Sequence, residues 1–366
     1  MSRSIAISFL LTVVVSMRAA ALDSPPFPAG TSQFFQTYAI SAVPAQDGGV
    51  WIALPDGIAH YTAAGPGTVL AVPGGTPYRL RLAADGSLWF ATSTIVARMT
   101  TTGTVVEQYA IADASFTVAS DGAIWYVRAS GSIVGRIVGG TPVEWPSPAT
   151  NVSSIAPAPA GDVWLLGSGF GSAPDVLHRM TPAGAVTVIP LNADVLYGRL
   201  QSLPDGTLYI GTGYRESLLR LAPGASSVEA VPHFHDERFL VDAHENIWSA
   251  TLAQLTYLAA NRVSSFTIPL PYDPRSCANV PVWGYALLAV DSSGGLWLRV
   301  VDDGFYFPEA PPCDEPVPPE MPTLVRIDTA ALLTLHGFGG IPTLTPSMLV
   351  ALAAIIVATA MSRLRG

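Results

Sequence analysis

One short pattern recurs seven times along this chain and limits the folds that it can adopt. Each copy has an apolar stretch, a Gly-containing turn and then an aromatic residue between aliphatic ones. The aromatic residues have a mean spacing of about 41 residues and are Trp51, Trp89, Trp125, Trp164, Tyr209, Trp248 and Trp297. A repeat of roughly 40 residues built from short strands is typical of a β-propeller blade, whereas helical repeats need a 3.6-residue period that is missing here.

The second copy shows how four strands fit one repeat. Arg79 to Ala83 forms a first strand, the Asp85-Gly86 turn leads into Leu88 to Ala91, and Val96 to Met99 and Val105 to Ala110 follow. Aromatic anchors on second strands pack between neighbouring sheets in a propeller. The repeat therefore predicts an all-β, seven-bladed β-propeller over residues 33–338, with four antiparallel strands per blade and the anchors in the core.

Closure of the ring needs a strand from outside the seven copies. Gln33 to Ile40 looks like a fourth strand but precedes the first blade. Pairing it with the seventh unit would remove the free edges of an open ring. Ala331 to His336 is the alternative outer strand of the last blade.

Composition supports a turn-rich β protein and excludes one class of partner. The 366 residues include 33 Gly and 32 Pro, and only 12% are charged. All 18 basic residues are Arg, and the net charge is −9. A chain of this charge offers no basic surface to nucleic acid. We expect a monomer.

The two ends predict export and a membrane tether. Residues 1–21 contain Arg3, an apolar run and Ala19-Ala20-Ala21, as a signal peptide does; a buried N-terminal helix is the alternative. From Leu344 to Met361 the chain is uncharged, and Arg363 and Arg365 follow. This stretch is long enough for a transmembrane helix with a cytoplasmic basic flank.

Residues 341–366 resemble the IPTL-CTERM sorting signal of Gram-negative bacteria. The resemblance rests on Ile341, Pro342, Thr343 and Leu344, the apolar run and the closing Arg363 and Arg365. It implies transient membrane retention, a sorting protease as partner, and delivery from the periplasm to the outer surface or an extracellular matrix. A permanent C-terminal membrane anchor is the alternative.

The chain has only two cysteines, Cys277 and Cys313. Two cysteines cannot supply a four-cysteine zinc site, and in an oxidising compartment an even pair is typically bonded. We expect a disulfide that restrains a long proline-rich insertion.

The repeats resemble those of the virginiamycin B lyase (streptogramin lyase) family. The likeness lies in Leu88-Trp89-Phe90-Ala91-Thr92, Ile133-Val134-Gly135-Arg136-Ile137 and Gly103-Thr104-Val105-Val106-Glu107-Gln108-Tyr109. It implies a seven-bladed propeller. In that family a histidine base and Mg²⁺ open a cyclic depsipeptide by elimination.

The family's catalytic residues are missing from their expected places. The stretches that hold its histidines read Asp236-Glu237-Arg238-Phe239-Leu240 and Gly284-Tyr285-Ala286-Leu287-Leu288 here, and Val301 stands where the metal-binding Glu would be. Pro77-Tyr78-Arg79-Leu80 and Leu196-Tyr197-Gly198-Arg199-Leu200 do match the family's cleft motif. The resemblance therefore implies that Tyr78 and Tyr197 face the ligand side.

A second set of polar residues is expected on the same face. His233 and His235 point the same way on an extended segment, and Glu237 follows, so the three are weak candidates for a base or a metal site, against a solvated loop. The other residues expected there are Tyr214, Arg215, Glu216, Tyr285, Asp302 and Asp303.

The sequence favours an exported, surface-sorted propeller that binds or scaffolds an unknown small ligand, glycan or protein, without lyase catalysis and without an assigned cofactor. The alternative is a Mg²⁺-dependent C–O lyase in which His233, His235 and Glu237 take over the chemistry. A third possibility is a purely structural matrix protein.

Overall fold

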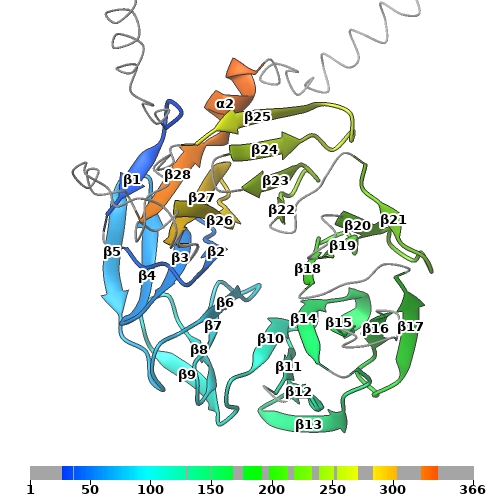
Figure 1. The fold of residues 1–366 in the computed structure, drawn as a ribbon. Helices are drawn as coiled ribbons and strands as arrows, with labels where there is room; N and C mark the ends of the chain where they lie inside the picture. Colours follow the sequence, from blue (N-terminus) through cyan, green and yellow to red (C-terminus); the bar gives the residue numbers. More distant parts are fainter. Residues whose placement is uncertain are drawn as a thin grey trace, which may run out of the picture.

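The computed structural model describes residues 27–35, 37–128, 131–149, 151–167, 176–191, 198–212, 218–232, 239–250, 254–270, 283–302 and 323–336. Within these ranges the strands form seven sheets of four antiparallel strands. Figure 1 shows the sheets as blades around a common centre. The predicted seven-bladed β-propeller is therefore confirmed.

The first four blades follow one another along the chain, each starting at the ring centre and ending at the rim. Blade one is β2 (Ser41–Pro44), β3 (Val50–Leu54), β4 (Gly57–Thr62) and β5 (Gly65–Leu70). Blade two is β6 (Arg79–Leu82), β7 (Leu88–Ala91), β8 (Val96–Met99) and β9 (Val105–Tyr109). Blade three is β10 (Ser115–Val118), β11 (Ile124–Val127), β12 (Ile133–Val138) and β13 (Thr141–Pro146). Blade four is β14 (Val152–Pro157), β15 (Val163–Gly167), β16 (Val176–Met180) and β17 (Val186–Pro190), with the 3₁₀ turn η1 (Pro159–Gly161) between its first two strands.

The last three blades complete the ring. Blade five is β18 (Arg199–Ser202), β19 (Leu208–Gly211), β20 (Leu218–Leu221) and β21 (Glu229–Ala230). Blade six is β22 (Phe239–Val241), β23 (Ile247–Ala250), β24 (Gln254–Leu258) and β25 (Ser265–Pro269). Blade seven is β26 (Trp283–Val290), β27 (Gly295–Asp302), β28 (Leu324–Asp328) and β1 (Ser32–Phe34), and the helix α2 (Thr329–Leu335) follows β28.

The N-terminal strand closes the ring, as the sequence predicts. β1 pairs with β28 through Gln33 opposite Val325, although the strand is shorter than expected (Figure 1). The alternative strand over 331–336 is wrong, because α2 occupies most of that range. Asp328 caps α2 by accepting hydrogen bonds from the backbone N–H groups of Ala330 and Ala331, and the Ala- and Leu-rich sequence favours a helix.

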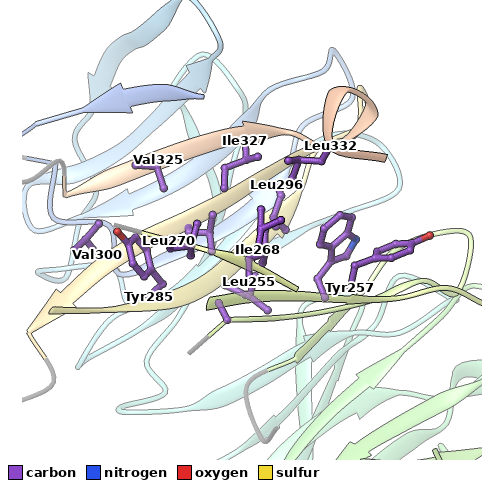
Figure 2. Packing of buried hydrophobic residues seen from close by; sticks show 14 residues of the cluster. Leu255, Tyr257, Ile268, Leu270, Tyr285, Leu296, Val300, Val325, Ile327 and Leu332 are labelled. Atoms are coloured by element: carbon purple, nitrogen blue, oxygen red, sulfur yellow. The ribbon is translucent and has the colours of Figure 1, made fainter. Parts of the chain in front are cut away.

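The core consists of seven apolar clusters, one between each pair of neighbouring blades. Each cluster contains the anchor aromatic of one blade and first- or second-strand residues of the next. Figure 2 shows the cluster between blades six and seven, where Leu255 and Ile268 meet Leu296 and Val325. The prediction that the anchors are core residues on second strands is confirmed.

The hairpin-turn aspartates have a further contact that the repeat pattern alone does not predict. In blades two, three, four and seven an arginine on the third strand lies directly opposite the anchor Trp, with its guanidinium within 6.0 Å of the ring centre. The same arginine forms an ion pair with an aspartate at the turn between the first and second strands of its own blade. The pairs are Arg98 with Asp85, Arg136 with Asp121, Arg179 with Asp162 and Arg326 with Asp291.

Several predictions about the ends lie outside the described residues. They are the signal peptide of 1–21, the sorting segment of 341–366 and the bond between Cys277 and Cys313. Among the residues that the structure describes, no helix is both long and apolar enough to span a bilayer. The expectations about the ends stay predictions.

Candidate functional site at the ring centre

The innermost strands of the blades hold one another in place by side-chain to backbone hydrogen bonds. Ser41 Oγ of blade one accepts from the N–H of Leu80 in blade two at 3.3 Å. Gln201 of blade five bonds both the N–H and the C=O of Val241 in blade six, at 2.9 and 2.6 Å. These hydrogen bonds fix the positions of the innermost strands, and with them the backbone that carries the side chains at the ring centre.

Four arginines converge on that centre. Arg79 and Arg81 lie on β6, two residues apart, so they share one face of this innermost strand. Arg199 is the first residue of β18, the innermost strand of blade five. Arg299 lies on β27 and donates from Nη1 to the carbonyl of Ala39, just before the innermost strand of blade one, at 3.3 Å.

Arg79, Arg81 and Arg199 lie on innermost strands, β6 of blade two and β18 of blade five, which both border the ring centre (Figure 1), and repulsion among them contributes to their lowered pKa values. Burial, together with weaker repulsion from Arg79 and Arg199, lowers the pKa of Arg81 to about 10. Burial also lowers the pKa of Arg199, with added repulsion from Arg299 and Arg79. Blade five adjoins blades four and six only, so the space that it shares with blades two and seven is the ring centre (Figure 1).

Solvent reaches this cluster. Arg199 is exposed, and Arg79 and Arg81 are half-buried. Arg199 is thus surrounded by protein closely enough for its pKa to fall, yet it stays in contact with water. This combination is expected for a side chain at the centre of a ring of blades.

The cluster differs from the other arginines in its partners. Seven arginines of the described ranges form ion pairs with Asp or Glu, namely Arg98, Arg128, Arg136, Arg179, Arg220, Arg262 and Arg326. Within the same ranges, Arg79, Arg81 and Arg199 form none. Arg79 Nε is buried without a hydrogen-bond partner, as is Nε of the ion-paired Arg136, so the missing carboxylate is what distinguishes the cluster. A guanidinium in this state is available to an anion.

Tyr78 borders the cluster. Its ring lies 5.9 Å from the guanidinium carbon of Arg79, and its hydroxyl donates to the carbonyl of Ala114 at 3.4 Å. Burial raises the pKa of this hydroxyl, and the nearby carboxylate of Asp113 raises it further. Tyr78 is half-buried and adjoins the arginine cluster.

Tyr285, which the sequence assigns to the ligand face, is a core residue. Its side chain is fully buried in the cluster between blades six and seven (Figure 2), where it meets the ring of Phe27 edge-on at 6.3 Å. Its burial raises the pKa of its hydroxyl. The ring therefore contributes to packing between blades rather than to an exposed rim.

The other predicted site residues are not brought together by the described part of the chain. Asp302 ends β27, with its backbone opposite Trp283. Tyr197, Tyr214, Arg215, Glu216, His233, His235, Glu237 and Asp303 lie outside the described residues. Among the residues that are described, no group of three or more His, Cys, Asp or Glu side chains could hold a metal ion.

Sequence reasoning missed Arg79, Arg81 and Arg199 as site residues. Two arginines at alternate positions of an innermost strand could have indicated the site. The rest of such a strand is covered by neighbouring strands and blades, so charged side chains on it can reach water only at the ring centre. The third arginine comes from a blade more than a hundred residues away, and its proximity appears only when the ring closes.

Two surface cavities lie between outer parts of the blades and differ from the ring centre in their charged groups. One of about 640 Å³ lies between blades one and two, and one of about 440 Å³ between blades two and three. Arg98 contributes to both and is held by Asp85 and Glu107. Because the arginines that line these cavities are already paired with carboxylates, the cavities are weaker candidates than the ring centre.

No family model and no curated protein matches the chain. Among solved structures it is similar to a streptogramin B lyase, with 16% identity, a TM-score of 0.58, and coverage of 73% of this chain and 93% of that one. A catalytically inactive virginiamycin B lyase from Staphylococcus aureus with quinupristin gives 14% identity and a TM-score of 0.58, over 81% and 98% of the two chains. The extracellular domain of a protein from B. thetaiotaomicron, described as a hybrid two-component system, has 14% sequence identity and a TM-score of 0.56. The match covers 84% of this chain and 42% of that one. At these identities the similarity shows the propeller fold and nothing finer.

Proposed function

We propose that this chain is an exported, surface-sorted binding or scaffolding propeller, and that its ligand binds at the ring centre without lyase chemistry. The observation that carries the proposal is the cluster of Arg79, Arg81 and Arg199, which reaches solvent and has no carboxylate partner in the described residues. Charged groups left without partners at a shared, solvent-accessible place are typical of a binding site rather than of a folding core.

The position of Tyr285 supports binding over catalysis. By resemblance, lyases carry a histidine base in this stretch of the seventh blade. Here the side chain is fully buried, and burial raises the pKa of its hydroxyl, so it stays protonated at neutral pH. A protonated phenol cannot accept the substrate proton that the elimination must remove.

The described residues also do not fit Mg²⁺ at the ring centre. They place guanidinium groups there, which repel a divalent cation, and supply no cluster of acidic ligands. We therefore derive no step through Mg²⁺. The lyase alternative depends on His233, His235 and Glu237 together with the fold that the chain shares with streptogramin B lyase.

A turnover assay tests this proposal. The full-length protein in mild nonionic detergent is incubated with a streptogramin B depsipeptide, with and without Mg²⁺, and mass spectrometry follows the linear product. We expect none, while an authentic streptogramin B lyase in the same buffer gives complete conversion. Mg²⁺-dependent product that disappears in His233→Ala and His235→Ala variants would overturn the proposal.

Sorting by the tail is the second part of the proposal. The partners are a sorting protease and the membrane, and the destination is the surface or matrix of a Gram-negative cell. Cell fractionation with antibody against the propeller should find the wild-type protein at the surface and an Ile341-Pro342-Thr343-Leu344→Ala variant in the inner membrane. If surface adhesion depends on the propeller in the absence of any soluble ligand, the structural matrix role is favoured instead.

A further inference from the structure

We propose that the ring centre binds a small ligand, or the end of a longer one, that carries at least two neighbouring oxyanion groups, with Arg79, Arg81 and Arg199 as its direct contacts. The inference rests on the proposed binding function and adds the chemical class of the ligand.

Bringing these three cations together costs free energy. Three guanidinium groups from two non-adjacent blades repel one another at the ring centre. The chain has 27 acidic residues against 18 arginines and could have placed a carboxylate among them. Within the described ranges, however, no carboxylate pairs with any of these three arginines. We therefore expect a bound ligand to supply the compensating negative charge.

The other arginines of the chain provide an internal comparison. Where an arginine has a structural role, as Arg326 does, its guanidinium lies 6.0 Å from the ring centre of an anchor Trp and pairs with a turn aspartate. Arg81 instead lies over Phe116 of the next blade at 6.0 Å and donates to the carbonyl of Leu80 at 2.8 Å, and the described residues offer its guanidinium no carboxylate. Arg79 and Arg81 therefore have an aromatic contact, but among the described residues they lack the carboxylate that pairs with each structural arginine.

The donor groups determine the class of ligand. Guanidinium groups bind carboxylate, phosphate and sulfate through paired hydrogen bonds. Arg79 offers a buried Nε–H without a partner, and Arg199 lies at the start of β18, the innermost strand of blade five, across the ring centre from blade two (Figure 1). Three guanidinium groups carry three positive charges, whereas a single carboxylate or phosphate carries about one to two negative charges, so a ligand with at least two such groups balances the cluster best.

Calorimetric titration at low salt tests the inference on the full-length protein in nonionic detergent. The probes are pyrophosphate, citrate and trigalacturonate, with maltotriose as the neutral control. We expect at least one anionic probe to bind, and Arg81→Gln and Arg199→Gln to weaken it by about tenfold or more each, as for loss of a charged hydrogen bond. Arg128→Gln removes the same charge from the outer surface, where Arg128 pairs with Glu144, and should change the affinity less than twofold, within roughly the effect of a surface charge.

Thermal unfolding separates a binding role from a packing role. Without ligand, Arg199→Gln should unfold at a higher temperature than wild type because repulsion is relieved, and it should lose most of the stabilisation that the bound anion gives wild type. A lower unfolding temperature together with unchanged anion affinity would show a packing role and overturn the inference.

The choice of probes also distinguishes phosphate-bearing from carboxylate-bearing ligands, and failure of this inference from failure of the proposed binding function. Preference for pyrophosphate indicates a phosphate-bearing ligand, and preference for citrate or trigalacturonate indicates a carboxylate-bearing one; either supports the inference. If no anion binds to the folded protein but maltotriose does, the oxyanion class is wrong while the binding function stands. Depsipeptide turnover would instead contradict the binding function itself.

Discussion

At the scale of single residues, Asp291 shows how a blade satisfies its buried polar groups. Its side chain is fully buried and accepts hydrogen bonds from Trp297 Nε1 and Arg326 Nε at 2.9 Å each, and from the backbone of Gly295 at 2.7 Å. Burial alone would raise the pKa of Asp291, but hydrogen bonds from Arg326, Ser293 and Trp297 lower it below its ordinary value. The carboxylate thus stays ionised inside the last blade.

Replacing this carboxylate should be costly. Asp291→Asn leaves Arg326 buried without its counter-ion, so we expect the free energy of unfolding to fall by about 3 kcal/mol or more in urea titrations at pH 7. Asp85→Asn removes a more exposed carboxylate of the same motif and should cost about 1 kcal/mol or less. Equal effects of the two variants would show that the buried network does not stabilise the blade.

The same pair predicts a pH dependence. Because the pKa of Asp291 is lowered in the folded state, its contribution is present above the ordinary Asp value of about 4 and is lost as pH falls through the lower folded value. The difference in unfolding free energy between wild type and Asp291→Asn should therefore be constant from pH 7 to 5 and shrink as the solution is acidified below about 4. A difference that grows on acidification contradicts this assignment.

At the scale of elements, close cross-strand contacts decide which residues a strand tolerates. Gly135 on β12 lies opposite Tyr126 on β11, and a Cβ at this position would come within 2.1 Å of the tyrosine ring. The Tyr126 hydroxyl meanwhile donates to Glu144 at 2.5 Å, which ties β11 to the outermost strand β13. The glycine is therefore a packing requirement of blade three.

Gly135→Ala should destabilise the protein by about 1–3 kcal/mol, because the added methyl group displaces a buried aromatic ring. Val138→Ala on the same strand changes an exposed side chain and serves as the control. Chemical denaturation measures both. If Gly135→Ala unfolds like wild type, the ring moves without cost and the close contact is not needed.

At the scale of the whole molecule, the ring depends on one non-local pairing. Phe34 of β1 stacks on Trp297 of blade seven at 5.6 Å and meets Tyr61 of blade one edge-on at the same distance. The N-terminal segment thus completes the last blade and also fills the space between it and the first. Closure covers the edge of β28, which would otherwise be free.

Phe34→Ala should weaken this closure, lowering the unfolding temperature and promoting association through the exposed edge of β28. We expect a loss of roughly 2–3 kcal/mol for this half-buried aromatic ring. Calorimetry and light scattering measure the two effects. Phe35→Ala removes an exposed neighbour and should leave both unchanged, so similar behaviour of the two variants would argue against the role of Phe34.

The class of the fold and the period of its repeat are readable from the amino-acid sequence. Hydrophobic alternation and turn residues act within about ten residues, so strands, hairpins and the positions of the anchor aromatics were readable one blade at a time. Closure of the ring by a strand within 33–40 was also predictable. The N-terminal end has a strand without a neighbour and the last blade lacks a strand, so the two can pair.

Which side chains come together at the ring centre depends on the closed tertiary structure. Periodicity assigns a side chain to a face of its strand but cannot say which distant blade faces it, so the approach of Arg199 to Arg79 and Arg81 appears only in the closed ring. The same reason explains Tyr285, whose place in a motif suggested the rim while packing between two blades buried it. Local pattern governs which elements form, and long-range packing governs which side chains they leave free to bind.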